Sequence, residues 1–295
     1  MNASRSTYQI YPENVPKSPI TVRKKRVSFQ LSHLGLALST LFALFLAIAA
    51  LAPQRIVSVN PLETNARNAF SEPNAKNILG TDENGRDVLA RLVYGVRPSL
   101  IMGFGATAIG VTAGALIGLL SGLGPKFVDH LLMRALDVLL AFPDLLLALV
   151  IITFWGQGLG NAIIAIGVAS IPRYARVVRA QTFSIRNSGY VEAAVSLGLS
   201  RLQLITKHIL PNALKPLLVL STIGIGGKIA SGATLSFLGF GAPPPAPEWG
   251  AMLSISRNYL SNAWWLTATA GLAITFTVIA ITSLGRAISL RCEGR

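Results

Sequence analysis

Charged residues are scarce in this chain. They make up 13% of its 295 residues, against about 25% in a typical soluble domain. Hydrophobic residues make up 52%, and the mean hydropathy is +0.55. The apolar residues fall in long uncharged runs rather than at the spacing of an amphipathic surface helix. This distribution excludes an ordinary soluble domain and predicts an all-α polytopic membrane protein.

Cysteine clusters and phosphate-binding loops are also missing from the sequence. Cys292 is the only cysteine, which excludes an internal disulfide and a cysteine site for zinc or iron–sulfur. No Gly-x-x-x-x-Gly-Lys-Ser/Thr loop occurs, so energy from ATP would have to come from another polypeptide. The three histidines fall at predicted cytoplasmic edges, without a partner set for catalysis. We therefore expect no enzyme activity and no catalytic, cofactor-binding or metal-binding residues in this chain.

The positions of the basic residues account for the net positive charge of the chain. The formal net charge is +14, but Lys and Arg sit mainly at the ends of apolar runs. Such a placement is typical of a lipid-embedded protein, whereas nucleic-acid binding requires a clustered basic face. A basic cluster from Arg23 to Arg26 precedes the first apolar run and marks the cytoplasmic side. The polar stretch before that run is too long for a cleavable signal, so the run is expected to remain as an anchor.

The apolar runs predict six transmembrane helices with both termini in the cytoplasm. The expected organisation is a disordered cytoplasmic tail over 1–32, a first helix over 33–52, an extracytoplasmic loop with an interfacial helix over 53–97, a five-helix core over 98–285, and a cytoplasmic tail over 286–295. Asn84-Gly85 predicts a tight turn within the loop. Trp249, Tyr259, Trp264 and Trp265 are interpreted as an interfacial aromatic belt.

Small residues mark one face of the second predicted helix. Gly110, Gly114, Gly118 and Gly122 recur every four residues in an uncharged run. In lipid, small residues allow two helix backbones to approach closely. This helix is therefore expected to pack tightly against another helix over most of its length.

Aspartates and arginines flank the third and fourth predicted helices. A polar connection over 126–134 should lead into a helix over 136–155, and a turn at Gly156 to Gly160 into the fourth. Asp144 suits either a role in a transport pathway or a structural role, and Asp137 is interpreted as structural. The arginines of the fourth helix are expected to reach the cytoplasmic headgroups: Arg173, Arg176 and Arg179.

A polar segment over 188–212 interrupts the apolar pattern. Glu192 falls in the first turn of a predicted short helix, Gly198 breaks that helix, and Ser200-Arg-Leu-Gln203 is a capping-box pattern that starts a second. The second helix should carry Leu202, Ile205 and Ile209 on one side and end at Pro211. Two short helices joined at a glycine suit either a lever that a soluble partner moves or an ordinary interfacial loop.

The segment resembles a motif of a known transporter family. Glu192-Ala193-Ala194, Gly198 and Leu210-Pro211 are similar to the EAA motif of ABC importer permeases. Two further stretches, over 79–87 and 235–250, resemble the C-type permease of the dipeptide, oligopeptide and nickel importers. The resemblance extends from about Leu79 to Ser283.

The resemblance implies a type I importer fold with six helices and a list of partners. Segment 188–212 would be a coupling helix that docks on a cytoplasmic ATPase subunit, with contacts from Glu192, Ala193, Ala194, Gly198, Leu210 and Pro211. The partners would be two ATPase subunits that bind ATP and Mg, a second B-type permease, and an extracytoplasmic substrate-binding protein that delivers a peptide or similar solute. The expected location is the bacterial inner membrane.

Lys228 departs from the family pattern, which commonly has a small residue there. A lysine near mid-membrane should face a cavity or pair with an acid. Two roles stay open: a pathway residue that favours carboxylate-bearing substrates, or a partner of a carboxylate such as Asp144 or one in the second permease. The sequence does not identify the transported substrate. A secondary transporter is the alternative function, although the halves show no internal repeat and the spans hold few acids.

Overall fold

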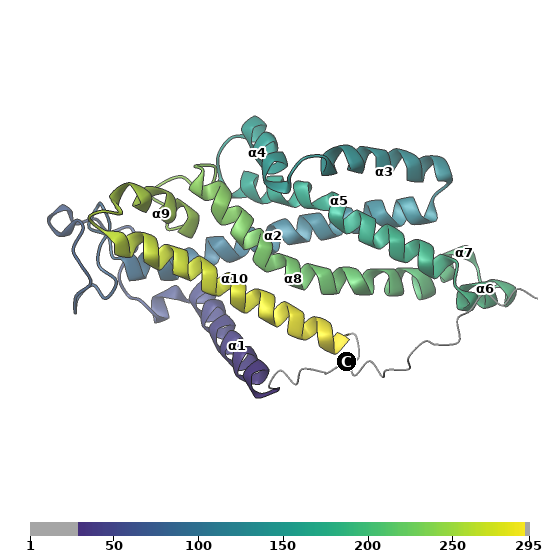
Figure 1. Ribbon diagram of the computed structural model, residues 1–295, viewed down its shortest axis with the longest axis horizontal. Coiled ribbons are helices and arrows are strands. Elements are labelled where there is room, and N and C mark those ends of the chain that lie inside the picture. Colours follow the sequence, from purple (N-terminus) through teal and green to yellow (C-terminus); the bar gives the residue numbers. More distant parts are fainter. Residues whose placement is uncertain (1–28, 293–295) are drawn as a thin grey trace, which may run out of the picture.

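The computed structural model describes residues 29–292, and the side chains of residues 35–291. Most of the predicted tail 1–32 lies outside the described residues. Five long helices dominate: α1 (Phe29–Leu51), α2 (Val88–Leu123), α5 (Leu159–Arg186), α8 (Leu210–Phe237) and α10 (Trp264–Cys292). They run roughly along the long axis of the molecule, with α1 diverging from α10 (Figure 1). Within residues 29–292 there is no β-strand, and Thr81 and Asp87 form an isolated bridge.

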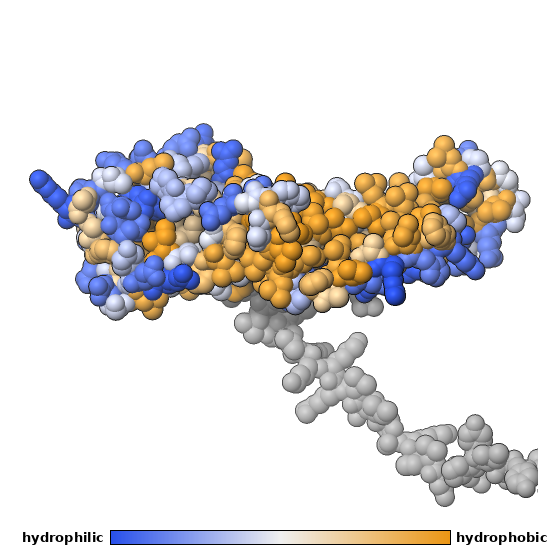
Figure 2. All heavy atoms as spheres, turned by 90° about the horizontal axis from the view of Figure 1, so that it is seen from above, coloured by the Kyte–Doolittle hydropathy of each residue, from blue (hydrophilic) through white to orange (hydrophobic). Residues whose placement is uncertain are grey.

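Hydrophobic residues cover the middle of the molecule, as expected for a membrane protein. Figure 2 shows them across the centre of one face, with hydrophilic residues gathered at the end that holds the 53–87 loop. By length and composition, three helices are able to cross a membrane, 88–123, 201–237 and 264–291, and a bent pair adds a fourth. The predicted count of six is therefore not fully confirmed, because the part of α1 with described side chains, Gly35–Leu51, is short and α5 carries several arginines.

The third predicted span is broken, and its boundaries were wrong. The expected polar connection over 126–134 is instead the start of α3 (Lys126–Leu140), and α4 (Asp144–Trp155) follows at an angle of 94°. Pro143 precedes α4 and ends the preceding helical path, because proline disfavours helical geometry in the residue before it. The turn predicted before the fourth helix is confirmed, with positive φ values at Gly156 (82°) and Gly158 (141°).

The glycine face of α2 packs against α5, as the sequence predicts. A Cβ atom on Gly114 would lie 2.6 Å from Cβ of Tyr174, and one on Gly118 would lie 2.6 Å from the carbonyl oxygen of Ala175. At Gly122 the same atom would lie 2.6 Å from Thr182. Contacts this short leave no room for a side chain on α2. The glycines therefore allow the backbones of α2 and α5 to approach closely.

The loop after α1 ends earlier than predicted. α2 begins at Val88, where the Asp87 side chain accepts a hydrogen bond from the Ala90 N–H, and it continues through Pro98 to Leu123. The expected separate interfacial helix is thus the first part of α2. An interior proline removes one helical hydrogen bond, which neighbouring helices in a membrane protein compensate. The predicted turn is confirmed: the Gly85 N–H donates to the Asp82 carbonyl at 3.0 Å, with φ of 72° at Gly85.

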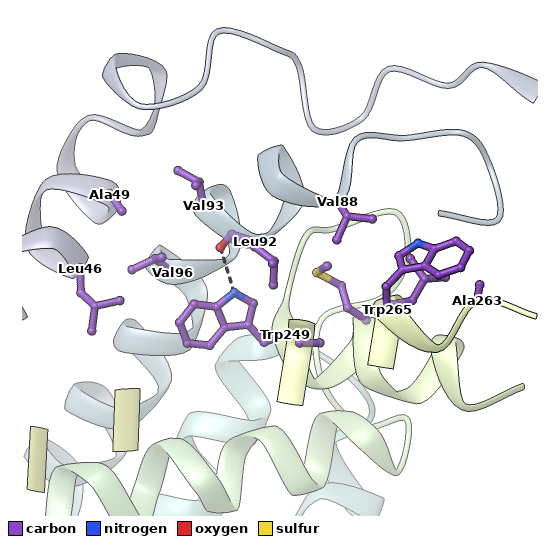
Figure 3. Packing of buried hydrophobic residues seen from close by; sticks show 12 residues of the cluster. Leu46, Ala49, Val88, Leu92, Val93, Val96, Trp249, Ala263 and Trp265 are labelled. Atoms are coloured by element: carbon purple, nitrogen blue, oxygen red, sulfur yellow. Dashed lines mark hydrogen bonds between the residues drawn. The ribbon is translucent and has the colours of Figure 1, made fainter. Parts of the chain in front are cut away.

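Two tryptophans assigned to an aromatic belt belong to the core instead. Trp249 and Trp265 are 2% and 5% exposed, and both lie in an apolar cluster with Leu46, Val93 and Val96 (Figure 3). The Trp249 Nε1–H donates to the Leu92 carbonyl at 2.9 Å, which satisfies its polar atom inside this cluster. Trp264, in contrast, is 65% exposed.

A structured cap covers the end of the molecule that holds the 53–87 loop. We define the cap as loop 53–87 together with segment 241–263, which contains the proline-rich stretch and α9 (Trp249–Ser256). The Phe70 and Tyr259 rings lie 4.8 Å apart, which joins the two parts. Glu248 is 1% exposed and accepts hydrogen bonds from the Gly250 and Ala251 N–H groups, both at 2.9 Å. Burial raises the pKa of the Glu248 carboxyl, and these backbone donors offset part of that effect.

Candidate functional site: segment 188–212 and the polar pairs of the helix bundle

Segment 188–212 forms two helical pieces joined at a glycine. α6 (Gly189–Ser196) has Glu192 in its first turn, and Gly198 follows with φ of 80°, a conformation that favours glycine. Ser200 then caps α7 (Arg201–Gln203) with the predicted capping box: its hydroxyl accepts from the Gln203 N–H, and the Gln203 side chain accepts from the Ser200 N–H. The helix, the glycine joint and the cap were all predicted from the sequence.

The second piece does not end at Pro211, contrary to the prediction. α7 continues through a π-helical turn over Leu204–Ile209 into α8, so residues 201–237 form one helical path. Pro211 lies in the first turn of α8, where its missing N–H is tolerated. The expected apolar side is also divided, because Leu202 is 71% exposed while Ile209 is 4% exposed.

The tip of this segment exposes apolar side chains. Val195, Leu197 and Leu202 are 55%, 81% and 71% exposed, and they surround the joint at Gly198. Glu192 and Ala193 are exposed as well, whereas Ala194 is buried, Leu210 is half-buried and Pro211 is exposed. The tip lies at the opposite end of the long axis from the cap (Figure 1). Their exposure makes these side chains candidates for a contact with a partner.

Three ion pairs connect α3 and α4 to α5. Arg179 Nε lies 2.5 Å from Asp129 Oδ1, and the Ser121 hydroxyl donates to the same carboxylate. The other two pairs join Arg176 to Asp137 at 2.5 Å and Arg173 to Asp144 at 3.0 Å. Each of the three arginines thus pairs with a carboxylate, and their reach to lipid headgroups stays a prediction. The structural interpretation of Asp137 agrees with its contact. The three aspartates and three arginines were visible in the sequence, but which pairs form depends on the bend after α3.

Lys228 is buried in α8, with 9% of its surface exposed. Among the described residues, no carboxylate lies within 4.0 Å of its ammonium group, and Asp144 pairs with Arg173 instead. Pairing of Lys228 with Asp144 is thus not seen. Asp144 and Arg173 keep 36% and 62% of their side chains exposed, so this pair forms a polar, accessible site among apolar helices.

The cap holds a second charged network, which was not predicted from the sequence. Asp82 accepts from Arg86 Nε at 2.7 Å and lies 3.3 Å from Arg91 Nε. All three side chains are buried. Within residues 29–292 there is no group of three potential metal ligands. The Asp82 and Glu83 carboxylates pair with arginines, so the turn is an ion-paired corner of the fold.

The structure defines a helical polytopic membrane protein with exposed apolar side chains at the tip of segment 188–212 and a structured cap at the opposite end. Comparison with known proteins identifies the family. Residues 114–293 match the family described as the binding-protein-dependent transport system inner membrane component. The chain belongs to this family, and it is the membrane-spanning permease subunit of an ATP-binding-cassette importer.

Relatives from several bacteria are similar over most of the chain. The di/tripeptide transport system permease protein DppC of Pseudomonas aeruginosa is 37% identical over 97% of this chain and 95% of its own length. The dipeptide permease DppC of Alkalihalophilus pseudofirmus is 40% identical over 87% of this chain and 83% of its own length. The glutathione permease GsiD of Pectobacterium atrosepticum is 39% identical over 72% of this chain and 71% of its own length.

Solved structures show the same fold. The MetNI methionine ABC transporter in an inward-facing conformation has a TM-score of 0.58 at 21% identity, covering 68% of this chain and 96% of its own. An amino acid ABC transporter has a TM-score of 0.56 at 20% identity, covering 69% and 94%. The fold is that of a type I importer permease, a transport subunit rather than an enzyme. Membership of this family implies two kinds of partner, an ATPase and a substrate-binding protein.

Proposed function

We propose that this subunit forms half of a translocation pathway for peptides or related small solutes in the bacterial inner membrane. The names of the relatives support a peptide cargo, and the glutathione permease among them is consistent with a small peptide-like solute. The observation that carries the proposal is the tip of segment 188–212. Its apolar side chains are exposed at the end of the molecule away from the cap.

In this proposal, segment 188–212 docks on a cytoplasmic ATPase. The contact residues are Glu192, Ala193, Ala194, Gly198, Leu210 and Pro211, with the exposed Val195, Leu197 and Leu202 supplying apolar area. ATP and Mg²⁺ are bound by two ATPase subunits, and this chain holds no cofactor. Because α7 continues through the π-helical turn into α8, a displacement of the tip acts directly on a membrane helix. That continuity supports a coupling role better than a flexible loop would.

A second permease completes the pathway. We propose a B-type subunit as a heterodimeric partner, facing the accessible Asp144–Arg173 pair and the nearby Lys228. These polar residues are candidates to line the pathway, since charged groups inside a membrane protein usually face a cavity or a partner. The positive charges of Lys228 and Arg173 together exceed the negative charge of Asp144. This net positive charge favours a substrate with a carboxylate.

The cap faces outward in this arrangement, and both termini lie in the cytoplasm. The basic cluster from Arg23 to Arg26 before α1, and Arg286 and Arg291 at the end of α10, support this orientation by the positive-inside rule. The substrate-binding protein would then deliver its solute to the cap.

Substitution of Gly198 tests the coupling role. Gly198→Ala should strain the joint, because its φ of 80° disfavours any residue with a Cβ, by about 1–2 kcal/mol. Gly198→Pro should be more severe. Gly189→Ala is the matched control in the same segment, since a Cβ there would meet no atom within 4 Å and its φ is ordinary.

The measurements are co-purification of the ATPase, ATP hydrolysis and peptide uptake in proteoliposomes. We expect the Gly198 variants to lower uptake per ATP hydrolysed or to weaken ATPase association, and the Gly189 control to behave as the unaltered protein. Affinity of the binding protein for its substrate should stay constant. A Gly198→Pro variant that assembles and transports normally would refute the coupling role.

A further inference from the structure

Arg91 is buried where three separate segments of the cap meet. It lies in the first turn of α2, and only 3% of the residue is exposed. Its Nη1 donates to the carbonyl oxygen of Pro245 at 3.2 Å and is 3.4 Å from that of Pro61, while Nε lies 3.3 Å from Asp82 Oδ2. One acceptor belongs to the loop after α1, one to the 82–87 turn and one to the proline-rich stretch.

The side chain at this position needs the geometry of arginine. A guanidinium offers five N–H donors in a planar fork, so one group is able to serve acceptors that lie in different directions. A lysine ammonium at the same place keeps the charge but concentrates its donors at a single atom. Pro61 is buried and the Arg91–Pro245 hydrogen bond is part-buried, so loss of this fork would leave both carbonyls without this donor and weaken the connection between the three segments.

A second set of contacts holds the proline-rich stretch against the same part of α2. The Trp249 indole donates to the Leu92 carbonyl (Figure 3). A Cβ on Gly95 would lie 2.8 Å from Trp249 and 2.9 Å from the Pro247 carbonyl oxygen. The stretch is therefore anchored at one end by aromatic packing and in its middle by Arg91. Its outermost residues, Pro243 to Pro245, stay exposed, as do residues 62–67 of the loop.

We infer that Arg91 is a positioning residue that holds loop 53–65 and the proline-rich stretch 241–248 together as one preformed docking surface for the substrate-binding protein. The inference rests on the proposed function, which places the cap outside the cell. A surface that is ordered before binding does not lose conformational entropy when the partner arrives, so it binds more tightly than two independent loops. Arg91 itself is buried and acts through the backbone that it holds.

The variant Arg91→Met is suited to the test because Asp82 still has an ion-pair partner without Arg91. Asp82 keeps its contact with Arg86 Nε at 2.7 Å, so no buried carboxylate is left alone. Arg91→Lys is the conservative variant, with the charge kept and the fork removed. Arg97→Met is the matched control, since Arg97 is exposed on the same helix six residues further on.

The experiment uses the whole transporter, with the second permease and the ATPase, in lipid nanodiscs. Purified binding protein charged with a dipeptide is titrated in, and stimulation of ATP hydrolysis is recorded. We expect Arg91→Met to raise the half-saturating concentration of binding protein tenfold or more, with assembly and basal hydrolysis unchanged. Arg91→Lys should give an intermediate rise, and Arg97→Met none. Hydrogen exchange should increase in residues 53–65 and 241–248 together in the Arg91 variants alone.

An unchanged half-saturating concentration in Arg91→Met would overturn the inference, as would faster exchange confined to α2. If Arg91→Met does not assemble, Arg91→Lys decides by the same two readouts. Failure of the unaltered transporter to respond to any binding protein is a different result, because it would contradict the proposed function rather than the role of Arg91.

Discussion

The close contact between α2 and α5 makes Gly118 a sensitive position. In Gly118→Ala the new Cβ would lie 2.6 Å from the Ala175 carbonyl oxygen and 2.7 Å from Val178 Cβ. Ordinary contact begins at 3.4 Å, so the helices would have to separate locally by about 0.8 Å. The obstructing atom at Ala175 belongs to the backbone, which no change of rotamer moves.

The expected loss of stability follows from these distances. Overpacking of this kind costs about 1–3 kcal/mol, and alanine recovers up to about 1 kcal/mol of helix propensity relative to glycine. Gly271→Ala in α10 is the matched control, because a Cβ there would meet no atom within 4 Å and only the propensity gain applies. The difference between the two variants isolates the packing cost of about 1–3 kcal/mol.

Thermal unfolding of the purified protein in detergent measures this difference. At roughly 2–4 °C per kcal/mol, the value for domains of 150–250 residues, Gly118→Ala should unfold roughly 2–12 °C below Gly271→Ala. Gly118→Val should lower the midpoint further, since its larger side chain meets the same backbone. Equal midpoints for Gly118→Ala and Gly271→Ala would show that the glycine face does not set the distance between α2 and α5.

Two further predictions concern buried ionisable residues. Because burial raises the pKa of Glu248 above its ordinary 4.5, the folded protein binds its proton more readily than the unfolded chain. The stability of the unaltered protein relative to Glu248→Gln should therefore fall as pH rises through the raised pKa. The measurement is the difference between their thermal midpoints from pH 5 to pH 8. Glu63→Gln, at an exposed position, is the control, and a difference independent of pH would contradict the argument. Lys228→Met should lower uptake of carboxylate-bearing peptides more than uptake of C-terminally amidated ones, whereas Lys215→Met, at an exposed position, should not. Equal effects on both peptides would exclude a pathway role for Lys228.

Local features of this protein were predictable from short stretches of sequence. The turn at Gly85, the joint at Gly198 and the capping box at Ser200 each depend on a few neighbouring residues whose backbone preferences are strong. The glycine face of α2 was predictable for a similar reason, because a spacing of four residues places small residues on one side of any helix. Of these positions, Gly198 belongs to the candidate coupling surface.

Helix ends at prolines were less predictable. A helix end was expected at Pro211 and a boundary at Pro98, yet both residues lie inside continuous helical paths. Proline removes one hydrogen bond and restricts the preceding turn, but packing against neighbouring helices decides whether the helix continues. At Pro143 the same residue type does accompany a sharp bend, into α4.

The sequence by itself determined the membrane class, the family motif and the local turns, because these depend on composition and on residues close together in the chain. The tertiary structure decided which distant residues meet. It paired the three arginines of α5 with aspartates of α3 and α4, placed Trp249 and Trp265 in the core, and brought Pro61, Asp82 and Pro245 to Arg91. Contacts between distant residues depend on helix bends and loop conformations, which the whole chain determines. Local sequence patterns therefore do not predict them.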